Sequence, residues 1–505
     1  MKRLAIILGF CSCTLTAAQA QDSFDDLLKS SRMQFDAVVK SARDDYQKLR
    51  EEADREYAKV MKEAWAESLA YKAIEPPKEV PVVPVKYEKM ELTLPSIKLP
   101  VKDFSVVELP QPKKVLPVAV PLPVVEKKDI PTVFPVKKDE LAGAMFSFPF
   151  YGSQIEVAAG KEHKFALKSL SEGDIAKAWS TLGHEKYKGL LESCLKVRSE
   201  KNMCDWAYLK MLNTLFDTLF GGRCNESTML AAYVYAQSGY KVRLAKNSNR
   251  LYLLYASCHT IYSKNFWRVD GDKFYLYDGD VNSVNICRAK YDNEQPMSMQ
   301  ISSSPILAKN NSGNRALKSK RYPEAVGNVR INKNLIDFFN DYPLAGVDNE
   351  NWVLNANTPI SDEVKATLYP SLKKAIAGKK EIDALNCLLN FVQTALVYER
   401  DEKVWGHDRV FFAEETLFYP YADCEDRSIL FSRLVRDLMG LDVVFLYYPG
   451  HLATAVKCRL QQQGDYVVVG ASRYLVCDPS YINAPAGATM PEVAQQKASV
   501  IKLND

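Results

Sequence analysis

The chain has 505 residues, enough for roughly two or three domains with separate hydrophobic cores. Hydrophobic residues make up 47% and charged residues 25%, the composition of a soluble globular protein. The formal net charge is only +4 and no basic patch stands out, so nucleic acid is not an expected partner.

Residues 1–20 have the pattern of a secretory signal peptide. Lys2 and Arg3 supply a positive start, and an apolar stretch begins at Leu4. Residues 18–20 read Ala-Gln-Ala, a small-x-small cleavage site. We therefore expect an exported protein of the periplasm or cell envelope.

Two alternatives to a cleaved signal are less favoured. The apolar run is too short for a membrane anchor, and no later segment is apolar enough for a transmembrane span. A lipoprotein signal through Cys11 or Cys13 fits poorly because Phe10 stands where a small residue is wanted. Removal of residues 1–20 would leave nine of the eleven cysteines, an odd number, so at least one is expected to be unpaired within the chain. A catalytic thiol would explain this, although buried reduced cysteines are common.

Residues 22–72 are expected to form one long amphipathic helix. Apolar side chains recur about every 3.6 residues, the period of a nearly straight helix. They are Phe24, Leu28, Phe35, Val38, Ala42, Tyr46, Leu49, Ala53, Tyr57, Val60 and Ala64. The other faces are charged, with Arg43, Asp44, Lys48, Arg50, Glu51, Asp54 and Arg55. Such a stripe usually packs on the protein's own surface. A partner helix or an envelope surface is the alternative.

Residues 76–140 are expected to form a Pro-rich extended spacer. Pro76-Pro77 ends the helix, and 13 prolines but no glycine occur between 76 and 135. Proline fixes φ and removes donors, which favours a stiff segment without a core of its own. A linker is the preferred interpretation, but the many valines could also lie along a domain surface.

Two later stretches resemble each other with a period near 200 residues. In 141–290, a helical run over 206–220 leads to Cys224, and a second run to Gly239 precedes strands at 241–245, 251–256 and 274–277. In 331–505, a helical run over 382–396 precedes Cys424, a helix to Gly440 and strands at 442–447, 452–456, 466–469 and 474–477. Residues 291–330, rich in Ser and Asn, are expected to connect them. The fold class is therefore α+β, with two modules that each pack a Cys-bearing helix on an antiparallel sheet.

The C-terminal module carries the chemistry. Asp423 is a good helix N-cap, which places the Cys424 thiol in the first turn, where the helix dipole favours thiolate. His451 stands at the mouth of one strand and Asp478 at the end of another. His451 could take the thiol proton or pair with the thiolate, and Asp478 could orient the imidazole.

Three sequence motifs in this module resemble those of the transglutaminase-like superfamily. They are Cys-Glu-Asp-Arg-Ser at 424–428, Tyr-Pro-Gly-His-Leu at 448–452 and Cys-Asp-Pro-Ser-Tyr at 477–481. The resemblance covers 376–490 well and 330–376 loosely. It implies a papain-like core with a Cys-His-Asp triad, as found in thiol peptidases, amidases, cross-linking enzymes and several inactive relatives.

Other residues of this module are candidates for the base or for oxyanion stabilisation. His407 is a rival base, but a loop or cleft role is preferred. Oxyanion stabilisation is expected from the Cys424 backbone N–H and one side-chain donor, for which Tyr421 and Tyr419 are candidates. No metal-binding motif and no cofactor signature occurs, so none is expected.

The first module is expected to be a degenerate copy. Alignment of Cys224 with Cys424 places Arg250 at the position of His451, and arginine cannot act as a base. Asp278 keeps the third position, but it is followed by glycine. His259 is expected at the opposite end of its strand.

Two function classes follow. The first is an exported thiol enzyme that attacks amide bonds of a peptide or protein through an acyl-enzyme on Cys424, with hydrolysis favoured over cross-linking. The second is a non-catalytic envelope scaffold or binding protein that uses an inert copy of the same fold.

Overall fold

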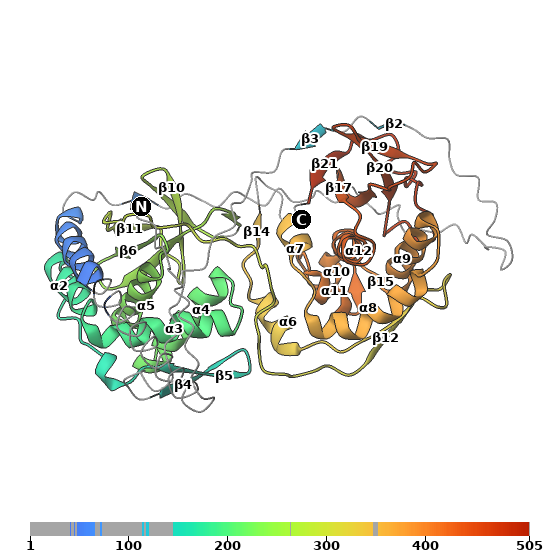
Figure 1. Cartoon of the computed structure of the whole chain (residues 1–505). Coiled ribbons are helices and arrows are strands. Elements are labelled where there is room, and N and C mark those ends of the chain that lie inside the picture. The colour runs from blue at the N-terminus through green and yellow to red at the C-terminus, as the bar shows by residue number, and fades with distance from the viewer. Residues whose placement is uncertain are drawn as a thin grey trace, which may run out of the picture.

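The computed structural model of the chain describes residues 41, 45, 48–65, 71–72, 114–115, 118–120, 145–262, 264–346 and 352–503 (Figure 1). They form two lobes side by side, each with helices packed against a curled antiparallel sheet, which confirms the α+β class. Among these residues, no helix combines the length and apolar character needed to cross a lipid bilayer. The expected signal peptide, 1–20, lies outside the described residues.

The second lobe contains the sequence motifs. Its helices are α7 (Trp352–Asn357), α8 (Asp362–Ile376), α9 (Glu381–Ala395), α10 (Asp401–Val404), α11 (Ala413–Phe418) and α12 (Cys424–Met439). Its sheet contains β17 (Val443–Tyr448), β18 (His451–Val456), β19 (Tyr466–Val469), β20 (Ser472–Cys477) and β21 (Ser499–Lys502). A parallel bridge joins β15 (Val397–Tyr398) to β16 (Tyr421–Ala422). Helix α12 lies end-on in the middle of this lobe in Figure 1.

The first lobe repeats this plan. It opens with the hairpin β4 (Met145–Phe150) and β5 (Ser153–Ala158), followed by short 3-10 turns η3 (Lys161–His163) and η4 (Glu185–Tyr187). Its helices are α2 (Glu172–Leu182), α3 (Lys188–Glu200), α4 (Asp205–Phe220) and α5 (Asn225–Gln237). Its strands are β6 (Val242–Lys246), β7 (Leu251–Ala256), β8 (Thr260–Ile261), β9 (Phe266–Val269), β10 (Asp272–Leu276) and β11 (Ser283–Ile286).

The internal duplication extends to strand order. The central strands run β9-β10-β7-β6-β11 in the first sheet and β19-β20-β18-β17-β21 in the second, and each Cys-bearing helix packs on the same hairpin of its sheet. The helices and strands predicted around Cys224 and Cys424 agree with these elements to within two residues. They were predictable because most are short apolar runs or periodically apolar stretches bounded by turn residues.

The connector prediction for 291–330 was wrong. Met297, Met299 and Ile301 are buried against the first lobe. The hairpin β12 (Arg315–Lys318) and β13 (Val326–Val329) belongs to the second lobe, where Gly327 approaches α8 so closely that a Cβ would lie 2.3 Å from a Leu368 methyl carbon. The polar composition of the segment concealed these alternating apolar residues at 297, 299 and 301.

Helix α6 (Lys333–Asn340) joins the lobes through aromatic side chains. The ring of Phe338 lies 5.8 Å from that of Trp206 in the first lobe. The neighbouring Phe339 stacks at 4.4 Å on Phe412 in the second lobe. One helix therefore contributes to both cores. After α6, β14 (Ala345–Gly346) pairs back with β8.

The N-terminal helix is shorter than expected. It runs over 48–64, positions 41 and 45 are also helical, and Tyr71–Lys72 form strand β1, so the predicted helical end at 72 was wrong. The part before 41 lies outside the described residues. As preferred from the sequence, the helix packs on the protein itself: Tyr57 and Met61 are buried in the first lobe.

The buried face of this helix differs from the predicted stripe. Leu49 and Val60 of that stripe are 66% and 51% exposed, whereas Asp54 is only 1% exposed. The Asp54 carboxylate accepts hydrogen bonds from Tyr233 Oη and Tyr291 Oη, both at 2.7 Å, and from Gln237 Nε2 at 2.5 Å. Burial raises the pKa of Asp54, against the effect of these hydrogen bonds. Asp54 thus holds the helix on the first lobe through buried hydrogen bonds, which the spacing of apolar residues could not predict.

The N-terminal region also pairs with the sheet edges. Strand β1 extends the first sheet at β11, while β2 (Lys114–Val115) and β3 (Val118–Val120) cover β19 and β21 of the second. For 114–115 and 118–120 the preferred linker interpretation was therefore wrong, and the alternative of valines along a domain surface holds. Edge pairing suits a Pro-rich chain because an edge strand tolerates missing donors on its outer side.

We expect Asp54→Ala to destabilise the first lobe by roughly 2 to 4 kcal/mol, because it leaves buried hydroxyl and amide donors without an acceptor. Urea unfolding of the full chain measures this. Glu52→Ala, at an exposed position of the same helix, is the matched control and should change the free energy of unfolding little. Equal stability of the two variants would show that Asp54 does not anchor the helix.

Candidate functional site

The start of α12 is built as the sequence predicts. Asp423 is the N-cap, and its carboxylate accepts the backbone N–H of Asp426, while the Asp426 carboxylate accepts that of Asp423. Cys424 is therefore the first helical residue, and it is 9% exposed. Gly440, with φ +61°, ends the helix in the left-handed conformation that glycine tolerates. The two caps fix where α12 begins and ends, and so place Cys424 at its first turn.

Asp478 is fixed at the end of β20 by its own turn. Its Oδ1 accepts the backbone N–H groups of Ser480 at 2.8 Å and Tyr481 at 3.2 Å. Its Oδ2 lies 2.8 Å from His451 Nε2. Both groups are buried. The carboxylate thus orients the imidazole, with the proton on Nε2 and Nδ1 as the basic nitrogen.

Two buried side chains that the sequence did not single out support this loop. Gln393 Nε2 on α9 donates to the carbonyl oxygens of Asp478 and Tyr481, at 3.0 and 2.8 Å. The Arg427 guanidinium donates to the Gln393 and Leu396 carbonyl oxygens, at 3.1 and 3.0 Å. No sequence signal marks Gln393, because its partners lie more than 80 residues away along the chain.

Helix α12 meets β18 at the same edge of the sheet. Ser428 Oγ donates to the Leu452 carbonyl oxygen at 3.0 Å. The Leu452 backbone N–H hydrogen-bonds the Cys424 sulfur and lowers its pKa. Since Leu452 directly follows His451, the start of α12 meets β18 at the strand end that carries the His451–Asp478 pair. The structure therefore brings the three predicted residues to one edge.

The state of the thiol differs from the expected thiolate. Burial raises the pKa of Cys424 well above its usual range, and the negative charges of Glu425 and Asp423 add to this. The Cys424 Sγ donates to Glu425 Oε2 at 2.9 Å. The helix dipole favours the thiolate, but these neighbours outweigh it in this conformation. Glu425, which is also buried, is thus a site residue that the sequence reasoning missed.

The imidazole has the opposite tendency. Burial lowers the pKa of His451, but the charge of Asp478 and its hydrogen bond outweigh burial, so the net shift is upward. A protonated His451 paired with Asp478 is therefore stabilised.

The other predicted residues do not share these contacts. His407 is exposed, and its Nδ1 lies 3.1 Å from the Trp405 carbonyl oxygen in its own loop. Tyr419 donates its hydroxyl to Asn340 at 3.0 Å, and its ring packs against Trp405. Tyr421 lies in β16 and is 41% exposed. The loop role for His407 fits this placement, and of the two tyrosines only Tyr419 has its hydroxyl engaged elsewhere.

Buried acids behind the thiol are the groups best placed to hold a cation. Carboxylate oxygens of Asp401, Asp423 and Asp426 lie within 4.8 Å of one another. Backbone groups already use them: Arg409 N–H donates to Asp401 at 2.7 Å and Phe411 N–H to Asp426 at 2.9 Å. Burial raises the pKa of Asp423 and Asp426 well above the usual range. Hydrogen bonds and shared protons therefore explain how these three buried carboxyl groups can lie so close together.

In the first lobe, arginine takes the place of histidine. Arg250 lies 3.2 Å from Asp278, as His451 pairs with Asp478, which agrees with the sequence alignment. Cys224 is the N-cap of α5, and its sulfur accepts the Ser227 backbone N–H at 3.3 Å. His259 accepts the Met299 N–H beyond the far end of β7, and burial lowers its pKa to about 4. No described base therefore pairs with Asp278 there.

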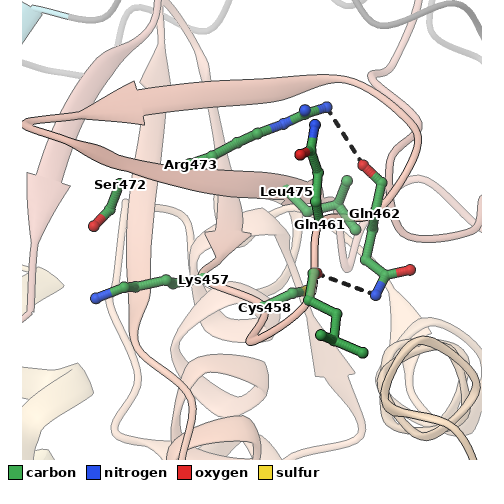
Figure 2. A pocket seen from close by; sticks show the side chains of 8 residues that line it. Lys457, Cys458, Gln461, Gln462, Ser472, Arg473 and Leu475 are labelled. Atoms are coloured by element: carbon green, nitrogen blue, oxygen red, sulfur yellow. Dashed lines mark hydrogen bonds between the residues drawn. The ribbon is translucent and has the colours of Figure 1, made fainter.

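A pocket of about 230 Å³ opens at the other end of the second sheet (Figure 2). Cys458 and Leu460 line it just beyond the end of β18, and Arg473 lines it from the start of β20. Because His451 begins β18 and Asp478 follows β20, this pocket lies at the opposite end of both strands from the triad. It is not part of the site.

No protein-family model, curated protein or solved structure matches the chain.

We expect the pKa of His451 to lie above its ordinary value of 6.5 and to fall in Asp478→Asn. Titration of the imidazole by nuclear magnetic resonance measures it, with His451→Gln to assign the signal. Because the folded pKa is raised, the ion pair contributes full stability below pH 6.5 and loses it as pH rises through the folded value. An unchanged pKa in Asp478→Asn would show that the pair is not coupled.

We expect Glu425→Gln to make Cys424 more reactive, since it removes the negative charge next to the sulfur. The alkylation rate with iodoacetamide at pH 8 should rise roughly 3- to 10-fold, as expected for a lower thiol pKa. Peptide mapping by mass spectrometry follows Cys424 separately from the other cysteines. Glu200→Gln, at an exposed position of α3, is the control and should alkylate as the parent chain does. An equal or slower rate for Glu425→Gln would contradict the role of the charge.

Proposed function

We propose that the chain is an exported thiol enzyme of the transglutaminase-like type, which attacks an amide bond of a peptide or protein. The observation that carries this is the His451–Asp478 contact at the end of β18 that packs on the capped start of α12, where Cys424 lies. The order Cys, His, Asp and the three motifs support the same family. A papain-like arrangement in the second lobe, with a degenerate copy in the first, is part of this proposal.

In the proposed reaction, the Cys424 sulfur attacks the amide carbonyl carbon while His451 Nδ1 takes the thiol proton. The tetrahedral oxyanion collapses, the C–N bond breaks, and His451 returns the proton to the leaving amine. Water, deprotonated by His451, then hydrolyses the thioester and releases the acid and the thiol. Asp478 holds the imidazole and stabilises its charged form. No cofactor takes part.

The thiol must leave Glu425 before it can react. In the structure the Cys424 thiol is largely buried and donates to Glu425, so substrate binding has to displace this 2.9 Å contact. The same burial favours the second candidate, an inert scaffold that uses this fold for binding alone. Chemical trapping of the acyl-enzyme distinguishes the thiol enzyme from the inert scaffold.

We expect an acyl adduct on Cys424 when the full chain is incubated with a mixture of peptide amides and quenched in acid. Intact-protein mass spectrometry detects the adduct. Cys424→Ala should abolish it and His451→Ala should reduce it by roughly 100-fold or more, the contribution of a general base. Cys224→Ala is the matched control and should leave adduct and turnover unchanged.

A lost adduct in Cys224→Ala, with Cys424→Ala still active, would move the active site to the first lobe. If the parent chain forms no adduct and Cys424 alkylates no faster in the presence of the peptides, the scaffold function stands instead.

A further inference from the structure

The first lobe keeps a cavity at the edge that corresponds to the active edge of the second. The cavity has a volume of about 490 Å³ and includes Asp278. Three aromatic side chains form part of its wall: Trp206 on α4, Tyr255 on β7 and Tyr277, directly before Asp278. Such a mixture of aromatic and charged walls is typical of sites for small ligands.

Two of its carboxylates are already paired with arginines. Arg223 lies 2.7 Å from Asp217 and 3.5 Å from Asp278. Arg250 lies 3.2 Å from Asp278 on its other side. These four groups therefore compensate one another, and neither acid has charge left to balance a further cation.

The third carboxylate is also engaged. Asp341 lies 3.2 Å from Lys210 and accepts the Tyr151 hydroxyl at 2.9 Å. The cavity wall itself contains three acids and three cations, Lys210, Arg223 and Lys264. Arg250 pairs with Asp278 from outside that wall. With Arg250 counted, four cations face three acids, which leaves one surplus positive charge.

Lys264 carries this surplus. Its Nζ reaches the Tyr277 carbonyl oxygen at 3.5 Å, and no carboxylate of the described chain comes within ion-pair distance of it. Burial lowers the pKa of Lys264, and Lys210 adds to this while Asp278 opposes it. A half-buried ammonium without an anionic partner costs free energy that a bound anion would recover.

We propose that this cavity binds the carboxylate of a small ligand with an aromatic or apolar body, with Lys264 as the partner of the carboxylate. A single negative charge matches the single surplus cation. A phosphate dianion would bring one negative charge more than Lys264 balances. An N-acylated amino acid and the C-terminal residue of a peptide both present this chemistry.

The proposal does not depend on thiol chemistry in the second lobe. Calorimetric titration of the full chain with N-acetylphenylalanine, its amide, a tetrapeptide that ends in phenylalanine, and inorganic phosphate tests it. We expect both acids to bind at least tenfold more tightly than the amide and phosphate. Tighter binding of the tetrapeptide would identify a peptide C-terminus as the ligand, and tighter binding of N-acetylphenylalanine a free acylated amino acid.

Variants test whether Lys264 is the cation that binds the ligand carboxylate. Lys264→Gln should weaken binding of the acid at least tenfold, and Lys264→Arg should retain most of it. Lys177→Gln, at an exposed position of α2 outside the cavity, and Cys424→Ala should bind as the parent chain does. Equal binding of acid and amide by the parent chain, unchanged binding by Lys264→Gln, or no binding of either acid at millimolar concentration would overturn the proposal.

Discussion

The buried contact between α12 and β18 is the constraint on which the site depends. Ser428 on the helix bonds the Leu452 carbonyl, and the Leu452 N–H bonds the Cys424 sulfur. A helix start is thereby held against the first residues of a central strand, next to His451. Arg427, fully buried beneath it, satisfies carbonyl oxygens from the neighbouring segments. A buried charge is tolerated there because each of its three nitrogens donates a hydrogen bond to a carbonyl oxygen.

The same frame occurs twice with different chemistry. Both lobes place a cysteine at a helix start and an aspartate after the inner strand of the sheet. In one lobe the aspartate orients an imidazole; in the other it pairs with Arg250. Because a guanidinium stays protonated, this exchange removes the base and leaves a charged, ordered wall. Such a wall suits recognition of a ligand rather than attack on it.

The N-terminal region contributes to both lobes. Asp54 and Tyr57 insert into the first core, where Tyr57 stacks on Tyr291 at 4.1 Å. Strands β2 and β3 cover both outer strands of the second sheet. Paired edges expose fewer free backbone groups to other chains, which lowers the tendency of a sheet to associate.

Local pattern in the sequence determined the elements, the N-cap at Asp423, the order Cys424, His451, Asp478 and the arginine at position 250. These depend on spacing within a few residues or on alignment of two copies. Tertiary structure alone decided that Asp54 is buried, that Glu425 accepts the hydrogen bond of the thiol, that Gln393 supports Asp478 and that 291–330 is packed into both lobes. Each of these depends on side chains that meet across long stretches of chain or on rotamers chosen by packing. Burial changes the free energy of a charge by more than local propensity does, so the polar contacts of the core could not be read from periodicity.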